Sequence, residues 1–331
     1  MRITIAAKFG VLIFLWAGVL FGGPYIVAHR GASGYRPEHT LAAYTMGLKR
    51  SADFIEVDLI STKDGVLICR HDCELGSTTD VADKFPDRKR TITIDGKRHF
   101  GFFAQDFYWK EIKQLRIRER NPFRSNRFDG KFSIPTFEEV LQLVEQHNQS
   151  QKKRVGVCPE LKHPAYHRRQ ALPLEERLLG LLNRYGYSSS QDRCVIQSFD
   201  PDCLRHLKKQ TDLRLLQLLP QEKKEDVVSS MFTNAGLAKI ATYATLIGVP
   251  KASLFHTSER CADRRPTGLI HRARQHDLKV WVYTFREIPQ SIWYAPTFAQ
   301  EVRQVADLQP DGLITDFPDL VRRILQTERR P

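Results

Sequence analysis

Two carboxylates stand two residues apart in an apolar stretch of the chain. Glu56 and Asp58 lie within residues 53–59, which are otherwise mostly apolar and predict a buried strand. Because alternate strand residues face the same side, the two carboxylates project together. Burying two carboxylates is costly unless a cation or another partner neutralises them, and such oxygen ligands suit Ca²⁺ or Mg²⁺. The pair predicts a divalent-cation site, with a salt-bridged strand end facing solvent as the alternative.

Two histidines strengthen the interpretation of this stretch as a catalytic site. His29 and His71 each follow an apolar run, and each stands beside a charged residue, Arg30 or Asp72. Imidazole titrates near neutral pH, so the pair can supply an acid and a base. The guanidinium of Arg30 presents a fixed set of donors that suits a phosphate. Histidines that flank paired carboxylates therefore favour acid–base chemistry beside a metal.

Short apolar runs alternate with helical patterns along the rest of the chain. Together with residues 25–29 and 53–59, eight strands are predicted, with helices between them. The other six strands are expected at residues 155–161, 195–199, 213–219, 246–249, 278–284 and 312–315. Strands that alternate with helices indicate a parallel sheet, and eight of them indicate an α/β fold, the (β/α)8 TIM barrel. The candidate residues fall at the carboxyl ends of strands, where barrel active sites lie.

The barrel pattern is interrupted after its second strand. The dipeptide Asp64-Gly65 is a hairpin signal, so residues 66–71 are expected to run antiparallel and to bring His71 back over the carboxylate pair. An insertion at about residues 76–133 follows, without a clear period over most of its length. An insertion of this size is either a cap or binding loop over the site or a surface excursion. Its aromatic residues indicate that part of it packs.

Residues 1–23 differ in composition from the rest of the chain. Two basic residues precede an uncharged apolar run at residues 9–21, as in a secretory signal. The run falls short of the roughly 20 apolar residues that a membrane span needs. We expect residues 1–23 to be a signal peptide or an N-terminal anchor and residues 24–331 to form the barrel domain. The predicted location is periplasmic or secreted, with membrane anchoring through residues 9–23 as the alternative.

The chain is basic, with a net charge of +13 over 331 residues and a pI near 9.5. This charge suits an anionic partner such as a phosphate ester, a membrane surface or a nucleic acid. No zinc-finger spacing or RNA-binding signature accompanies it, and the basic residues are scattered rather than gathered in one stripe. We expect a small-molecule substrate and no nucleic acid, with contact to a membrane surface as an option and the oligomeric state open.

Several motifs occur in an order typical of one enzyme family. They are VAHRGASGYRPEHTLAAY (27–44), EVDLISTKDGVL (56–67), HD (71–72), TDVADKFPDR (79–88), CPELK (158–162), QSFD (197–200) and GLITDFPD (312–319). On these motifs, the chain after residue 24 resembles the glycerophosphodiester phosphodiesterases, most closely their bacterial periplasmic branch. The resemblance implies metal-dependent hydrolysis of a glycerophosphodiester to glycerol 3-phosphate and an alcohol.

The resemblance also implies roles for individual residues. It implies a catalytic acid/base role for His29 and His71, metal binding for Glu56, Asp58 and Glu160, and phosphate contacts for Arg30 and Lys162. Phe199 and Tyr283 are candidates for the wall that contacts the glycerol, with core packing as the alternative. One position departs from the family pattern, because Ser77 stands where an arginine is usual. The preferred head group therefore stays open.

Two other functions remain as alternatives. One is a phospholipase D-like hydrolase that acts on lysophospholipids. The other is a non-catalytic surface or periplasmic binding protein on the same barrel. The two histidines argue against a pure binding protein, because binding does not need an acid/base pair.

Overall fold

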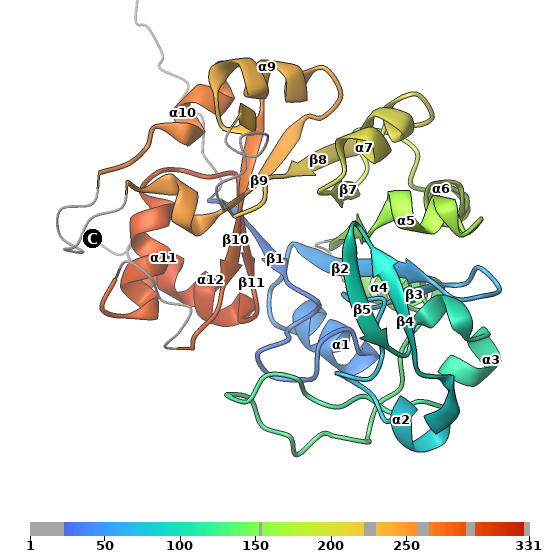
Figure 1. Ribbon diagram of the computed structural model, residues 1–331. Helices are drawn as coiled ribbons and strands as arrows, with labels where there is room; N and C mark the ends of the chain where they lie inside the picture. Colours follow the sequence, from blue (N-terminus) through green and yellow to red (C-terminus); the bar gives the residue numbers. More distant parts are fainter. Residues whose placement is uncertain (1–22, 152–153, 222–229, 257–264, 289–294, 328–331) are drawn as a thin grey trace, which may run out of the picture.

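In the described part of the chain, eight parallel strands close into a barrel (Figure 1). The computed structural model describes residues 23–151, 154–221, 230–256, 265–288 and 295–327. The barrel strands, in their order around the ring, are β1 (Tyr25–Ala28), β2 (Phe54–Ser61), β6 (Gly156–Leu161), β7 (Val195–Ser198), β8 (Arg214–Leu218), β9 (Leu246–Pro250), β10 (Lys279–Phe285) and β11 (Gly312–Thr315). Because β1 pairs in parallel with both β2 and β11, the ring closes. The predicted (β/α)8 barrel is confirmed.

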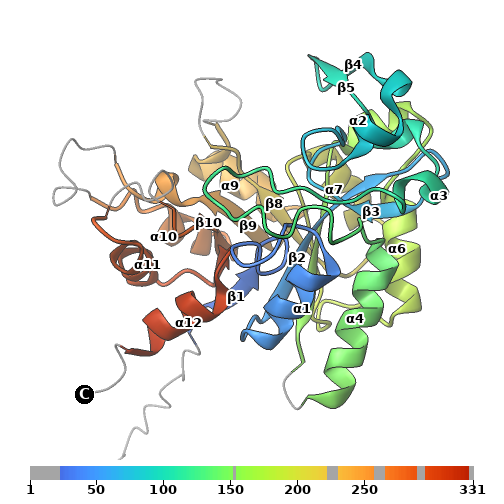
Figure 2. The same ribbon diagram turned by 90° about the horizontal axis from the view of Figure 1, so that it is seen from below.

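Helices fill the connections between strands and cover the outside of the barrel (Figures 1 and 2). They are α1 (Leu41–Lys49), α4 (Phe137–Ser150), α5 (Pro164–Arg169), α6 (Glu175–Arg184), α7 (Pro201–Lys208), α9 (Asn234–Ala241), α10 (Leu269–Arg274), α11 (Phe298–Ala306) and α12 (Pro318–Gln326). Thr136 and Glu139 form a capping box at the start of α4. The apolar face of α4, which includes Phe137 and Val144, is buried in the main core. Periodic apolar faces thus hold the helices against the sheet.

A short strand, β3 (Leu67–Cys69), extends the sheet antiparallel to β2. It is the hairpin that the turn signal predicts. The backbone N–H of Arg70 donates to the carbonyl of Asp58 at 3.0 Å, which continues the ladder by one residue. His71 is therefore returned to the level of Asp58 on the neighbouring strand.

The insertion after β3 is ordered and has a core of its own. It contains α2 (Val81–Lys84), the hairpin of β4 (Arg90–Ile94) and β5 (Lys97–Gly101), and α3 (Trp109–Ile112). Figure 1 shows these elements gathered beside β2 and β3, on one side of the barrel. Phe102, Phe103 and Phe107 are buried in the satellite core, whereas Phe100 is 65% exposed. The aromatic residues of the insertion therefore mark packing, as expected, but not all of them contribute to it.

A separate apolar cluster fills the inside of the barrel. It includes Phe54, Leu216 and Trp281, while the outer faces of the strands pack against the helices in the main core. The rings of Trp281 and Phe54 lie 5.2 Å apart between centroids. A Cβ on Gly312 would come within 2.6 Å of the Trp281 ring, so the glycine makes room for the indole. The barrel is therefore a packed core rather than a pore.

The predicted signal or anchor region, residues 1–23, lies outside the described residues except for its last position. Among the helices that are described, none has both the length and the apolar character to cross a membrane.

Candidate active site

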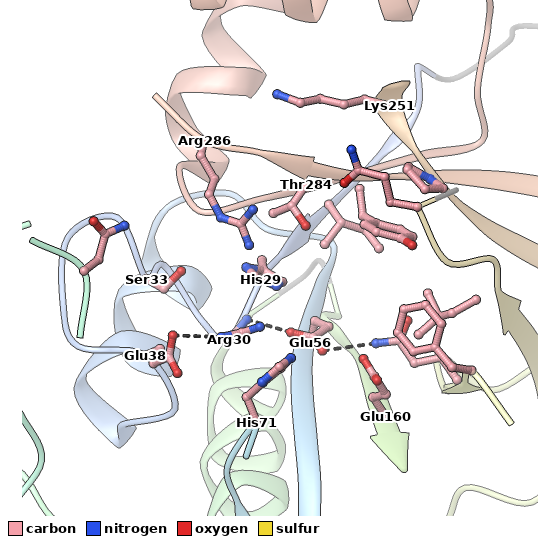
Figure 3. A pocket seen from close by; sticks show the side chains of 18 of the residues that line it. His29, Arg30, Ser33, Glu38, Glu56, His71, Glu160, Lys251, Thr284 and Arg286 are labelled. Carbon is pink, nitrogen blue, oxygen red and sulfur yellow. Dashed lines mark hydrogen bonds and ion pairs between the residues drawn. The ribbon is translucent and has the colours of Figure 1, made fainter. Parts of the chain in front are cut away.

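A cavity of about 550 Å³ opens at the carboxyl ends of the barrel strands. Figure 3 shows His29, Glu56, His71 and Glu160 arranged around this one opening. Of the nine residues singled out from the sequence, Asp58 alone does not line the cavity; the others are His29, Arg30, Glu56, His71, Glu160, Lys162, Phe199 and Tyr283. Asp58 lies beneath it, 1% exposed. Residues that are far apart in the sequence thus share one site.

Three carboxylates form the floor of the site. Glu56 and Asp58 come from β2, and Glu160 comes from β6, where it pairs in register with Asp58. One oxygen from each of the three lies within 4.8 Å of the others, and all three residues are buried. Parallel pairing of neighbouring strands therefore brings the third carboxylate to the pair that the sequence shows.

The electrostatics of the three carboxylates fit a cation site. Burial and the charges of Asp58 and Glu160 raise the pKa of Glu56 well above its usual value. Burial, together with Asp58, raises the pKa of Glu160 to about 8, although Lys162 opposes the shift. Burial opposes ionisation of Asp58 as well, but Lys162 and Arg30 hold its pKa well below the usual range. Even beside Arg30 and Lys162, two of the three carboxyl groups keep raised pKa values, so the site favours additional positive charge, which a divalent cation would supply.

Gln197 on β7 adds a further oxygen beside the carboxylates. Its Nε2 donates to Oε1 of Glu56 at 3.1 Å. Its Oε1 is buried and has no hydrogen-bond partner in the described part of the chain. An amide oxygen is also a suitable ligand for Ca²⁺ or Mg²⁺, so this orphaned atom is consistent with a cation at the floor.

His29 follows β1 directly and is held by Asp316, which follows β11. Nδ1 of His29 lies 2.7 Å from Oδ1 of Asp316. Burial and the charge of Arg30 lower the pKa of His29 to about 3, so the imidazole is neutral at pH 7. With Nδ1 engaged by the carboxylate, Nε2 is the nitrogen available to a substrate.

His71 is held in the same way by its neighbour in the chain. Nδ1 of His71 lies 2.6 Å from Oδ1 of Asp72. Burial and Arg30 lower the pKa of His71 to about 4. Both histidines are therefore neutral bases in this structure. An anionic phosphate bound between them would raise the pKa of each, because it favours the charged imidazolium.

Arg30 lies between Glu38 and the carboxylates of β2 (Figure 3). Its backbone N–H donates to Oε2 of Glu56 at 2.7 Å, and its Nη1 donates to Oε2 of Glu38 at 2.9 Å. Its Nε lies 3.2 Å from Oδ2 of Asp58. The backbone φ of Arg30 is 55°, a left-handed conformation that is uncommon outside glycine and often found at functional sites.

The wall of the cavity is completed by Lys162 after β6, Phe199 after β7 and Tyr283 on β10. Nζ of Lys162 donates to Oε1 of Glu160 at 2.6 Å and lies 5.6 Å from the centre of the Phe199 ring. The rings of Phe199 and Tyr283 meet edge to face at 6.3 Å. The Tyr283 hydroxyl donates to the carbonyl of Leu219, so its ring rather than its hydroxyl is left to the cavity. Both rings offer apolar surface to the carbon atoms of a bound polyol.

Several site residues were not assigned from the sequence. His39 contacts Asp58 through Nε2 at 2.8 Å, and its place in the quoted motif with Glu38 is the only sequence signal for it. Arg120 and Arg124 come from the insertion, and Arg286 follows β10; nothing local marks any of the three. Ser77 is exposed and does not line the cavity.

The sequence profile of the Glycerophosphoryl diester phosphodiesterase family matches residues 29–320, which is most of the chain. The chain belongs to this family. Glycerophosphodiester phosphodiesterase GDPD6 of Arabidopsis thaliana is 34% identical, with 89% of this chain and 84% of that protein covered. A glycerophosphodiester phosphodiesterase of Haemophilus influenzae is 32% identical, with 89% and 87% covered. The family membership implied by the motifs is confirmed.

Solved structures show the same fold. A glycerophosphodiester phosphodiesterase from Agrobacterium tumefaciens superposes with a TM-score of 0.59 at 22% identity, covering 90% of this chain and 99% of that one. A phosphodiesterase from Oleispira antarctica, solved with the product sn-glycerol-3-phosphate, gives a TM-score of 0.64 at 16% identity, covering 92% and 97%. At these identities the likeness shows the barrel fold.

Proposed function

We propose that this chain hydrolyses glycerophosphodiesters to glycerol 3-phosphate and an alcohol, with His29 and His71 as the acid/base pair. The observation that carries the proposal is that both histidines line one cavity above a floor of three buried carboxylates. Family membership supports the reaction class, and the product bound to the Oleispira antarctica relative is glycerol 3-phosphate. The same histidines argue against a non-catalytic binding protein.

The carboxylate floor would hold a divalent cation, Ca²⁺ or Mg²⁺. Glu56, Asp58 and Glu160 would hold this cation, which would supply positive charge to offset the negative charge that grows on the phosphate in the transition state. Arg30 and Lys162 are at present held by these carboxylates. Once the carboxylates are neutralised, both side chains can turn to the phosphate and share its charge.

The histidines move the protons. One neutral imidazole accepts a proton from the nucleophile, which is either water or the 2-hydroxyl of the glycerol. The other, protonated beside the bound phosphate, gives its proton to the departing alkoxide. Asp316 and Asp72 orient the rings from Nδ1, so both transfers use Nε2. Phe199 and Tyr283 line the cavity as an apolar wall for the glycerol carbons.

Release of glycerol 3-phosphate tests the proposal. Purified protein is given glycerophosphocholine, glycerophosphoethanolamine, glycerophosphoglycerol or glycerophosphoinositol, with and without chelator. We expect turnover that chelator abolishes and added Ca²⁺ or Mg²⁺ restores. Full turnover in excess chelator, with no metal in the protein, would refute the role of the carboxylate floor.

A lysophospholipid substrate is the second candidate. Phe123 is 58% exposed between Asn121 and Arg124, which line the cavity. An exposed aromatic at the rim suits an acyl chain or a lipid surface better than a small polar diester. Lysophosphatidylcholine separates the two when released choline is measured, because its hydrolysis gives choline and a lysophosphatidate rather than glycerol 3-phosphate. Only this lysolipid activity should fall in a Phe123→Ser variant.

Export of the protein is a proposal from the sequence alone. We propose that residues 1–23 act as a signal peptide or anchor and that residues 24–331 form the secreted or periplasmic domain. If the signal is cleaved, the mature protein should begin between about residues 18 and 25. Mass spectrometry of native protein checks this, and an intact Met1 in the soluble fraction would contradict cleavage.

A further inference from the structure

An arginine of the insertion contacts the carboxylate that holds His71. Asp72 accepts from Nδ1 of His71 through one oxygen at 2.6 Å, and from Nη1 of Arg120 through the other at 2.5 Å. The second terminal nitrogen of Arg120 donates to Glu38, whose other oxygen accepts from Arg30 at 2.9 Å. Arg120 is thus fixed at both ends of its guanidinium.

A second arginine of the insertion does the same for the other histidine. Asp316, which is fully buried, holds Nδ1 of His29 through Oδ1 and accepts from Nη2 of Arg124 through Oδ2. Nε of Arg286 also lies 3.3 Å from Oδ2 of Asp316. Nη1 of Arg124 faces Glu119 at 3.9 Å. Each histidine is therefore the end of a chain that runs from arginine to aspartate to imidazole.

Both arginines lie on one short stretch, residues 118–130, which we call the bridging segment. Backbone hydrogen bonds hold both ends of the segment against the rest of the insertion. The N–H of Arg118 donates to the carbonyl of Thr78 at 2.8 Å, and the N–H of Gly130 donates to the carbonyl of Ile117 at 2.9 Å. Within the segment, the N–H of Glu119 donates to Asp129 at 2.8 Å. In Figure 2 the segment, in green after α3, lies against the loop between β1 and α1. It therefore spans from the side of His71 to the side of His29.

We infer that the bridging segment is a positioning element for both histidines, with Arg120 acting through Asp72 on His71 and Arg124 acting through Asp316 on His29. The inference rests on the proposed function, since it assigns the histidines their role. It gives the insertion a part in the reaction that neither a surface excursion nor a simple cover over the site would have.

The chemistry of the two carboxylates explains why arginines are needed. Burial opposes their ionisation, but His71 and Arg120 hold the pKa of Asp72 below its usual range. Arg286, His29 and Arg124 do the same for the pKa of Asp316. An ionised carboxylate beside a neutral imidazole keeps the proton on Nδ1, so Nε2 presents its lone pair to the substrate. Each arginine also prevents the carboxylate from turning away from the ring.

The rival explanation is that Arg120 and Arg124 bind the substrate directly, because both line the cavity. An arginine that contacts an anionic head group contributes to binding and changes KM. An arginine that orients a histidine changes kcat, because it acts on proton transfer and leaves binding largely intact. The two explanations therefore predict different kinetic constants.

Kinetic constants of alanine variants give the first test, on the full chain with saturating metal. Arg120→Ala and Arg124→Ala should each lower kcat about 10–100-fold, with KM within about threefold of wild type. In a His71→Ala background, Arg120→Ala should cost less than about twofold more, and Arg124→Ala should do likewise in His29→Ala. Arg120→Gln and Arg124→Gln, which remove less of the side chain than alanine does, replace an alanine variant that does not fold.

Two arginines of the same segment serve as matched controls. Arg118 pairs with the exposed Asp83, and Arg127 lies over Phe128 at 4.6 Å, so Arg118→Ala and Arg127→Ala should leave kcat unchanged. A rise in KM at constant kcat, larger for anionic head groups, would make Arg120 and Arg124 substrate contacts. A loss of the same size with and without the matching histidine would likewise overturn the inference.

The protonation of the rings gives a test that needs no turnover. In protein labelled with ¹⁵N-histidine, His29 and His71 should carry their proton on Nδ1 in the wild type. Arg120→Gln should disturb the His71 signals alone, and Arg124→Gln those of His29 alone. If the wild type releases no glycerol 3-phosphate, the proposed function fails, whereas unchanged ring signals in both variants refute the positioning role itself.

Discussion

At the scale of single residues, the site is a set of charges that neutralise one another until a substrate arrives. Arg30 faces Glu38 and Asp58, and Lys162 faces Glu160. A phosphate must therefore compete with these carboxylates for the side chains of Arg30 and Lys162. A divalent cation that neutralised the carboxylate floor would remove this competition. Binding of the divalent cation and binding of the phosphate should therefore favour each other.

The two histidines give the first prediction. His29→Ala and His71→Ala should each lower kcat about 10²–10⁴-fold, because each removes a group that transfers a proton. Neither residue belongs to the carboxylate floor, so the concentration of metal needed for half-maximal activity should stay the same. Steady-state kinetics with a metal titration checks both points. Rescue of either variant by added metal would show that its histidine is a ligand instead.

Glu160→Gln gives the contrasting prediction. The amide keeps the shape of the side chain but removes a charge that a divalent cation needs. Activity at low metal should fall sharply, and it should recover in part as the metal concentration rises. The same metal titration measures it. A uniform loss at all metal concentrations would place Glu160 in proton transfer or substrate binding rather than at the cation.

At the scale of elements, the loop between β1 and α1 is held in close contact with α1. Gly31 has a φ of 81°, and a Cβ there would lie 2.6 Å from the carbonyl carbon of Ala43 in α1. The close approach fixes the backbone that presents His29 and Arg30. A side chain at this position must push the loop and the helix apart.

Gly31→Ala should therefore lower both stability and kcat. The left-handed conformation alone costs about 1–2 kcal/mol for alanine, and the clash adds displacement of the catalytic loop. Gly186→Ala is the matched control, because Gly186 has a φ of 77° with no atom within 4 Å of the added Cβ. It should lower the melting temperature without changing kcat. Equal kinetic losses in both variants would show that strain, and not the position of the loop, is responsible.

The elements also show where sequence reasoning reaches and where it ends. The eight barrel strands were predictable because each is an apolar run between helical patterns, and the return of His71 followed from Asp64-Gly65. The hairpin of β4 and β5 was missed, since its β5 strand, Lys97–Gly101, is almost entirely exposed and carries no apolar alternation. The contacts of Arg120 and Arg124 join positions 48 and 192 residues apart, so no local pattern could reveal them.

At the scale of the whole molecule, buried histidines link stability to pH. His167 on α5 is fully buried outside the cavity, with its Nε2 3.6 Å from Sγ of Cys73, and burial lowers its pKa to about 3. Unfolding restores a pKa near 6.5, so the unfolded chain binds more protons between these values. Its contribution is complete above pH 6.5 and declines as the pH falls toward 3.

His167→Gln should accordingly flatten the acid side of the stability profile. The variant lacks this titrating group, so the melting temperature should drop less between pH 6.5 and 4 than it does in the wild type, whatever its value at pH 7. Thermal unfolding followed by circular dichroism across this range measures the difference. His271→Gln, at an exposed histidine of α10, is the control. Parallel profiles for wild type and His167→Gln would mean that the pKa of His167 is the same in the folded and unfolded protein.

Metal binding should stabilise the barrel as a whole, because the carboxylate floor joins β2 to β6. Three buried carboxylates repel one another in the folded protein and not in the unfolded chain, and a cation that binds only the folded state stabilises it by about 2.7 kcal/mol at 100 times its Kd. Added Ca²⁺ or Mg²⁺ should thus raise the melting temperature, and chelator should lower it, in the absence of any substrate.

Glu160→Gln should reduce this rise in melting temperature, whereas Glu138→Gln, at an exposed ion pair with Arg184, should keep it. Since Glu160→Gln also relieves repulsion, its melting temperature in chelator should equal or exceed that of the wild type. If metal does not change the melting temperature of the wild type, the three carboxylates do not bind a cation. The raised pKa of Glu160 would then indicate a proton shared among the three carboxyl groups.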